Sequence, residues 1–262
     1  MPVSAAPVRV AGTVTTHLAT ETHRAVPSAA LLVARPASPV PPADLSDLPG
    51  LVIRAAPSER PSTVTLIAKR VMDIVGAAAG LLLLGPLLGG VALLIAAVDG
   101  RPVLFKQPRA GRDGEPFEIW KFRTMERDAD AQRGSLRVFN EVAGGASFKM
   151  DRDPRVTRLG RILRRTSLDE LPQLVNVLRG EMSLVGPRPH PFDDVAGYKP
   201  WHFGRLSVKP GVTGLWQISS RADPDFDHWV EMDLRYIREC SVTRDISIVL
   251  NTIPAVVRAT GR

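Results

Sequence analysis

Two adjacent carboxylates, Asp169 and Glu170, are the residues of this sequence whose types and spacing best fit a chemical role. Basic residues lie on both sides of them: Arg161, Arg164 and Arg165 before, and Arg179 and Arg188 after. Carboxylates can hold a divalent metal ion, while guanidinium groups bind phosphate oxygens through paired hydrogen bonds. This stretch therefore predicts a site that handles phosphate.

The same carboxylates also have a structural interpretation. Ser167-Leu168-Asp169-Glu170 matches the capping-box pattern S-x-x-E, in which the glutamate reaches back to the start of its own helix. Helix caps are far commoner than catalytic pairs, so these four residues taken alone favour the cap. The rest of the sequence has to decide between the two.

Composition narrows the classes of partner. The chain has 262 residues and a formal net charge of +7, which favours nucleic acid, an anionic membrane surface or a phosphorylated substrate. Aromatic residues make up only 5%, which weakens the case for base stacking on single strands. Cys240 is the single cysteine, so no intramolecular disulfide can form, and no Cys/His cluster has zinc spacing.

The chain divides into three parts by composition. Residues 1–62 hold ten of the 23 prolines and are expected to form a disordered extension. Residues 63–100 contain an uncharged run, 74–98, that is long enough to span a bilayer, but Gly85 and Pro86 interrupt it. Basic residues flank the run on both sides, which suits a re-entrant helix hairpin that enters and leaves by the same face. An ordinary kinked spanning helix remains equally consistent with these features.

Residues 101–262 are expected to form a small cytosolic domain of the α/β class, mainly helical with short strands. The predicted strands are 102–106, 116–122 and 215–218, and the predicted helices are 125–133, 155–165, 168–178, 226–240 and 246–257. The helices 155–165 and 246–257 are apolar on one face, so each either covers a core or lies at a membrane interface.

Seven motifs along residues 66–262, in this order, resemble the bacterial sugar transferases, which are monotopic polyprenyl-phosphate phosphoglycosyl transferases. The motifs are K-R-x-x-D at 69–73, V-L-F-K-Q-x-R-x-G at 103–111, K-F-R-T-M at 121–125, D-x-R-x-T-x-x-G at 153–160, L-R-R-T-S-L-D-E-L-P-Q at 163–173, G-P-R-P at 186–189 and K-P-G-V-T-G-L-W-Q at 209–217. Seven ordered matches outweigh the capping box as the sole explanation of Asp169 and Glu170.

The resemblance implies an enzyme at the cytoplasmic face of the bacterial inner membrane. It would transfer a sugar-1-phosphate from a nucleoside diphosphate sugar, usually a UDP-sugar, to polyprenyl (undecaprenyl) phosphate and release UMP. Asp169 would be the nucleophile that carries the phosphosugar covalently. Glu170, with Asp169, would hold Mg²⁺ or Mn²⁺. Such a step would initiate the assembly of an exopolysaccharide, capsule or O-antigen.

The resemblance also assigns supporting residues. Arg164 and Arg188 are expected to hold phosphate or to orient the carboxylates, and Lys121, Arg123 and Gln107 are weaker candidates with a structural alternative. Gly85 and Pro86 would form the break in the membrane helix. Ser220 stands where relatives commonly carry glycine, so the local turn is expected to differ.

Two other classes of function are alternatives to the transferase. A non-catalytic membrane scaffold on the same fold would need none of Asp169, Glu170 and Arg188. A nucleic-acid-binding protein is suggested only by the charge, and no recognition motif supports it. The sequence leaves open which sugar is transferred and whether the protein is a homo-oligomer.

Overall fold

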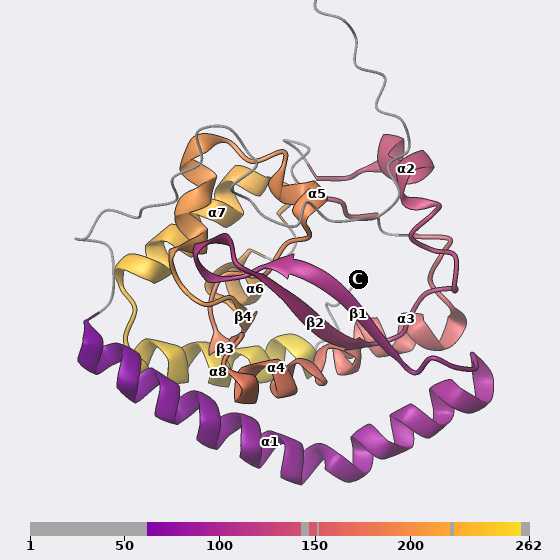
Figure 1. Cartoon of the computed structure of the whole chain (residues 1–262), viewed down its shortest axis with the longest axis horizontal. Helices are drawn as coiled ribbons and strands as arrows, with labels where there is room; N and C mark the ends of the chain where they lie inside the picture. The colour runs from indigo at the N-terminus through magenta and orange to yellow at the C-terminus, as the bar shows by residue number, and fades with distance from the viewer. Residues whose placement is uncertain (1–61, 143–146, 151, 221–222, 258–262) are drawn as a thin grey trace, which may run out of the picture. The chain divides into compact units, whose positions relative to one another are not determined.

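The computed structural model describes residues 62–142, 147–150, 152–220 and 223–257. These residues belong to one compact unit, Ser38–Arg262. The extension predicted at 1–62 lies outside the described residues, except for Ser62. Figure 1 shows the described elements, which are mostly helices with short strands, as predicted.

Helix α1, Thr63–Val98, is a single helix that continues through Gly85 and Pro86. Ser62 caps it by accepting a hydrogen bond from the backbone nitrogen of Thr65 at 3.1 Å. The helix bends near its middle (Figure 1), as expected where proline removes a backbone donor. The predicted interruption is therefore a bend within one helix, and a hairpin made of two helices stays a prediction.

Helix α1 is long and apolar enough to cross a membrane. Most of its apolar side chains are exposed, and Leu82 is 81% exposed. Ala77 and Ile95 are fully buried in the domain. Ala77 belongs to a core cluster with Ile119 and Leu174, and Ile95 to a cluster with Phe122 and Leu163. One face of α1 thus holds the domain, while the rest offers an apolar surface.

A buried polar network ties the first turns of α1 to the domain. The Lys69 ammonium donates to the Val185 carbonyl at 2.8 Å and forms an ion pair with Asp245. Asp73, one turn later, accepts hydrogen bonds from strand β3, Ser183–Val185. These contacts give the K-R-x-x-D motif a structural role, because they fix the position of α1 against the rest of the domain.

Strands β1, Leu104–Ala110, and β2, Pro116–Phe122, form an antiparallel hairpin. The second strand agrees with its prediction, whereas the first begins two residues later than predicted and continues to Ala110. The register pairs Phe105 with Lys121 and Arg109 with Phe117. Because residues directly opposite each other share a face, Gln107, Arg109 and Lys121 lie on one face of the hairpin.

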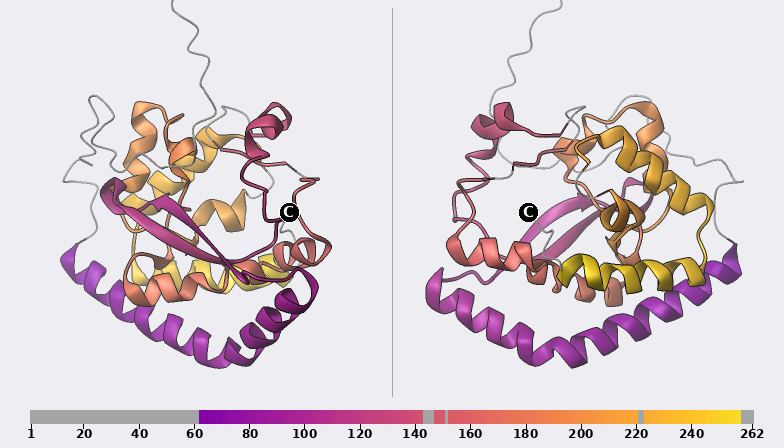
Figure 2. Two further views of the ribbon diagram at one scale, coloured as in Figure 1. Left: turned by 45° about the vertical axis from the view of Figure 1, so that its right-hand side comes forward. Right: turned by 180° about the vertical axis from the view of Figure 1, so that it is seen from behind.

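The second half of the domain is built on a two-stranded parallel sheet and several helices. Strand β3 pairs with β4, Gly211–Thr213. The helical elements are α2 Arg133–Leu136, η4 Arg137–Phe139, α3 Arg158–Arg165, η5 Leu168–Glu170, α4 Gln173–Arg179, α5 Phe192–Val195, η6 Pro200–Ser207, α6 Leu215–Ser219, α7 Phe226–Arg238 and α8 Val242–Val257. Helix α8 contacts α1 and both strands of this sheet (Figure 2).

Three predicted elements differ in the structure. The helix predicted at 125–133 was wrong: Met125 pairs with Val156 in an isolated bridge, and α2 begins only at Arg133. The strand predicted at 215–218 is helix α6, since a short apolar run does not distinguish a buried helix from a strand. The helix predicted at 168–178 is divided by Pro172, which starts α4.

Other predictions of helices hold. Helices α3 and α7 lie within the predicted ranges 155–165 and 226–240. Helix α8 has a buried side represented by Ile248 and an exposed apolar side represented by Leu250 and Ile253. Its contact with a membrane stays a prediction. Ser220 has φ −133°, so no positive φ is needed at this position.

Candidate active site

The two carboxylates lie in a tight turn between α3 and α4. Ser167 takes the left-handed conformation with φ 55°, and the short element η5 follows it. The Ser167 side chain makes no capping hydrogen bond. The capping-box interpretation was therefore wrong, because residue types alone do not show that Ser167 turns the chain instead of starting a helix. Gly180, with φ 84°, ends α4 as predicted.

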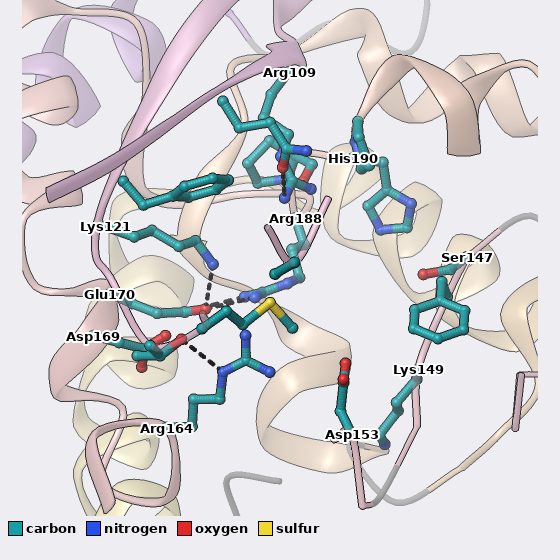
Figure 3. A pocket seen from close by; sticks show the side chains of 18 of the residues that line it. Arg109, Lys121, Ser147, Lys149, Asp153, Arg164, Asp169, Glu170, Arg188 and His190 are labelled. Atoms are coloured by element: carbon teal, nitrogen blue, oxygen red, sulfur yellow. Dashed lines mark hydrogen bonds and ion pairs between the residues drawn. The ribbon is translucent and has the colours of Figure 1, made fainter. Parts of the chain in front are cut away.

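Glu170 is held by two cations from different parts of the chain. Arg188 donates through both terminal nitrogens, Nη2 to Oε1 at 2.5 Å and Nη1 to Oε2 at 3.1 Å. The Lys121 ammonium donates to Oε1 at 2.8 Å, and Figure 3 shows both side chains converging on Glu170. Burial opposes ionisation, but the charges and hydrogen bonds of Arg188 and Lys121 hold the pKa of Glu170 well below its usual value.

Asp169, the neighbouring carboxylate, has a different environment. Its side chain is only 7% exposed, and no group among the described residues donates a hydrogen bond to either carboxylate oxygen. Burial, and then the charge of Glu170, raise the pKa of Asp169 to about 6, against the opposing effect of Lys121, Arg164 and Arg188. At neutral pH, Asp169 is therefore an ionised carboxylate whose lone pairs are free to react.

Arg164 lies on the last turn of α3 and faces the same region. Its Nε donates to the Thr124 hydroxyl at 2.9 Å, which fixes the guanidinium beside the carboxylates. Burial lowers the pKa of Arg164, and the nearby Asp169 charge opposes that shift. The structure places Arg164 next to the carboxylate pair, as predicted.

Gln107 supports a residue that the sequence interpretation missed. Its Oε1 accepts a hydrogen bond from Arg109 Nη2 at 2.6 Å, and Arg109 Nη1 donates to the Pro189 carbonyl at 3.2 Å. Burial, and then the charge of Arg188, lower the pKa of Arg109 to about 10. The signal was present in the sequence, because Gln107 and Arg109 are two residues apart in a strand and share a face.

Arg123 lies just after β2 and turns toward the end of α1. Its Nη2 donates to the carbonyl oxygens of Asp99 at 2.5 Å and Gly100 at 2.8 Å. These contacts favour the structural alternative for Arg123, and a contact with phosphate stays a prediction. Gly85 and Pro86 lie within α1 and take no part in the site.

The site residues line one open cavity of about 990 Å³, which is large enough for a substrate of drug-like size. Of the predicted residues, the cavity is lined by Gln107, Lys121, Arg123, Arg164, Asp169, Glu170 and Arg188. Residues that the sequence interpretation did not single out also line it: Arg109, Lys149, Asp153 and His190 (Figure 3).

The two carboxylates fit a magnesium ion that is completed by substrate. Mg²⁺ commonly uses one or two protein carboxylates and takes its remaining ligands from water and substrate phosphates. Asp169 has free oxygens for this, whereas Glu170 has less acceptor capacity left, because Oε1 accepts from both Lys121 and Arg188 and Oε2 accepts from Arg188 alone. The part of the chain that the structure describes contains no group of three His, Cys, Asp or Glu side chains that could hold a metal by themselves.

Comparison with known proteins gives one family and several relatives. Residues 64–259 match the family model described as bacterial sugar transferase. The galactosyl transferase CpsE of Streptococcus agalactiae serotype III is 47% identical over 199 residues, which cover 75% of this chain and 43% of that protein. The exopolysaccharide production protein ExoY of Rhizobium meliloti is 41% identical over 198 residues, with coverages of 74% and 88%.

A third relative is the UDP-glucose:undecaprenyl-phosphate glucose-1-phosphate transferase of Escherichia coli K12. It is 44% identical over 200 residues, which cover 73% of this chain and 40% of that protein. The chain thus spans less than half the length of CpsE and of the Escherichia coli relative, but matches most of ExoY.

Proposed function

Because the chain belongs to the bacterial sugar transferase family, as its motifs predicted, we propose that it transfers a sugar-1-phosphate from a UDP-sugar to undecaprenyl phosphate. The products are undecaprenyl diphosphate sugar and UMP. The name of the Escherichia coli relative describes this reaction for glucose, and the name of ExoY places a relative in exopolysaccharide production. We propose that this transfer is the first step in the assembly of such a glycan.

The observation that carries this proposal is the unequal pair of carboxylates on the cavity wall. Glu170 is bound by two cations, while the adjacent Asp169 is buried with both oxygens free of donors among the described side chains. In the proposed reaction, an Asp169 oxygen attacks the sugar-bearing phosphorus, and the bond from that phosphorus to the UMP oxygen breaks. An oxygen of the lipid phosphate then attacks the same phosphorus and releases Asp169.

The cations around the carboxylates supply what a reaction between anions needs. Attack by a carboxylate on a diphosphate brings negative charges together, so fixed positive groups must stabilise the transition state. The charges of Lys121, Arg164 and Arg188 all lie near Asp169 (Figure 3). A magnesium ion held by Asp169 and Glu170 would neutralise charge on the diphosphate.

The lipid acceptor accounts for the apolar surface of α1. Polyprenyl phosphate lies in a membrane, so the enzyme must present its cavity at the membrane surface. The exposed apolar side chains of α1, with Leu250 and Ile253 of α8, form a surface suited to that position. We place the domain on the cytoplasmic face of the inner membrane, where UDP-sugars are available.

The test is UMP release by the detergent-solubilised protein with undecaprenyl phosphate, Mg²⁺ and a panel of UDP-sugars. Release is expected with at least one sugar and should depend on the lipid and the metal. Asp169→Asn should abolish it, while Glu231→Gln, a matched change at an exposed carboxylate of α7, should not. Full activity of Asp169→Asn, or release without lipid at the same steady rate, would contradict the proposal.

A further inference from the structure

We propose that Arg205, paired with Asp233 inside the domain, is a positioning residue that holds the turn at 187–190 so that the Arg188 guanidinium meets Glu170. This inference rests on the proposed function, because it assigns a second layer of residues behind the same site. Neither Arg205 nor Asp233 lines the cavity, so any effect on the reaction has to pass through other residues.

Arg205 lies on η6 and Asp233 on α7, and each is only 1% exposed. The Arg205 guanidinium divides its donors among Asp233, the turn and the Tyr198 hydroxyl, to which Nη1 donates at 2.9 Å. Its Nη2 donates to Asp233 Oδ2 at 2.6 Å and to the Arg188 carbonyl at 3.1 Å. Its Nη1 contacts His190 Nε2 at 3.3 Å. One fully buried guanidinium therefore holds the turn at two points, two residues apart.

A buried ion pair of this kind needs a reason other than stability. Taking both charges out of water opposes folding, and replacing such a pair by apolar residues is often neutral or stabilising. An apolar replacement would lose the hydrogen bonds to the Arg188 carbonyl and to His190, as well as the one to the Tyr198 hydroxyl, which lies outside the turn. The geometry points to positioning as the gain that offsets the cost of burying Arg205 and Asp233.

The contact with His190 has a consequence that can be observed directly. A guanidinium group only donates hydrogen bonds, so His190 Nε2 must accept, and the neutral ring must carry its hydrogen on Nδ1. Burial, and then the charges of Arg205 and Arg109, hold the pKa of His190 well below its usual value, so the ring stays neutral. Arg205 thus fixes both the orientation and the tautomer of a side chain on the cavity wall.

The link to the reaction runs from Arg205 through Arg188 to Glu170. The bonds between Arg188 and Glu170, at 2.5 and 3.1 Å, require the backbone of the turn to stay in place. A displacement of about 1 Å at a distance from the chemistry can cost about 100-fold in rate. Loss of the support from Arg205 is therefore expected to lower kcat by about 10- to 100-fold, as for residues that orient metal ligands.

The experiment replaces the pair as a unit, with Arg205→Met/Asp233→Leu, so that no buried charge is left alone. The control is Arg235→Met/Glu239→Leu, the same exchange at an exposed ion pair of α7. The first variant should lower kcat 10- to 100-fold without unfolding, and the control should not change it. Both are then combined with Arg188→Ala.

In the Arg188→Ala background, Arg205→Met/Asp233→Leu should cause no further loss, because the residue through which it acts is already gone. An equal loss in both backgrounds, or no loss in either, would overturn the proposal.

A second measurement does not depend on activity or on the double replacement folding. Nitrogen-15 NMR of the histidine-labelled protein, with His190→Gln for assignment, should show His190 as the neutral tautomer protonated at Nδ1. Arg205→Lys should alter the His190 signals but leave those of His228 unchanged, because His228 contacts Ser220, Asp223 and Glu231 instead of Arg205. A ring protonated at Nε2 in the parent protein, or an unaltered ring in Arg205→Lys, would refute the inference even if the transferase reaction itself were confirmed. If no UDP-sugar gave UMP, the proposed function would fail while this measurement still decided the role of Arg205.

Discussion

Replacing Asp169 by asparagine should abolish activity and at the same time stabilise the folded protein at neutral pH. The side chain is buried, and its pKa is raised from 3.8 to about 6, first by burial and then by the charge of Glu170. The folded state therefore binds the Asp169 proton more tightly than the unfolded chain does. Ionisation of Asp169 consequently disfavours folding, and asparagine, which resembles the protonated acid, avoids that cost.

The size of the effect follows from the shift. One pKa unit corresponds to about 1.4 kcal/mol, so a shift from 3.8 to about 6 amounts to about 3 kcal/mol at pH 7.5. For a domain of this size, that raises Tm by about 6–12 °C. The destabilisation develops as the pH rises from about 4 to 6, since only the unfolded chain is ionised in that window. At pH 4.5, the advantage of the asparagine variant should therefore shrink to about 1 kcal/mol.

The assay is thermal unfolding of both proteins in the same detergent at pH 4.5 and pH 7.5. Glu170→Gln is the matched control at the adjacent position, and it should have the opposite sign. The pKa of Glu170 is held below its usual value, so its ionised form stabilises the fold, and its loss leaves Lys121 and Arg188 without their partner. The reasoning is refuted if Asp169→Asn is no more stable than the parent at pH 7.5, or if its advantage is the same at both pH values.

Three further predictions concern the reaction and the frame of the site. Because attack needs the ionised Asp169, kcat/KM should rise with pH through about 6, and a flat profile between pH 5 and 8 would contradict its role as nucleophile. Arg188→Ala should lower kcat/KM by about 100- to 1,000-fold, as for loss of a hydrogen-bond donor to charge that develops in the transition state. An effect under about 10-fold in the UMP assay would argue against this role of Arg188. Gly160→Ala would place a Cβ 2.1 Å from the Thr124 carbonyl oxygen and should destabilise the fold by at least about 2 kcal/mol in chemical denaturation. Gly134→Ala, with open space around it, should be nearly neutral, and equal stabilities of the two variants would show that the backbone at Thr124 can move away from the added methyl group.

Periodic elements and ordered motifs were the predictable part of this protein. The apolar spacing of 226–240 identified α7, because that pattern repeats over enough residues to exclude the alternative. The run at 116–122 was recognised as an extended segment and forms β2. The carboxylate pair was found from residue types and from the motifs around it. The cavity brings together Lys121, Glu170 and Arg188, as the interpretation of a phosphate site requires.

What escaped prediction depends on tertiary contacts. The S-x-x-E pattern indicates a cap, but in the folded chain Ser167 takes the left-handed conformation and Glu170 binds Arg188 instead. The apolar run at 215–218 has no period that separates helix from strand, and the structure has helix α6 there. Arg205 and Asp233 lie 28 residues apart with no motif to join them, so only the folded chain reveals the pair.

The central claim is that Asp169 carries the phosphosugar, and capture of that intermediate tests it most directly. The protein is mixed with the UDP-sugar that supports turnover and with Mg²⁺, but without lipid, and the quenched protein is analysed by mass spectrometry. The account predicts up to one UMP released per protein and one sugar phosphate attached to the peptide that contains Asp169, and subsequent addition of undecaprenyl phosphate should remove it. An active protein that carries no adduct, or carries it on another residue, would contradict the account.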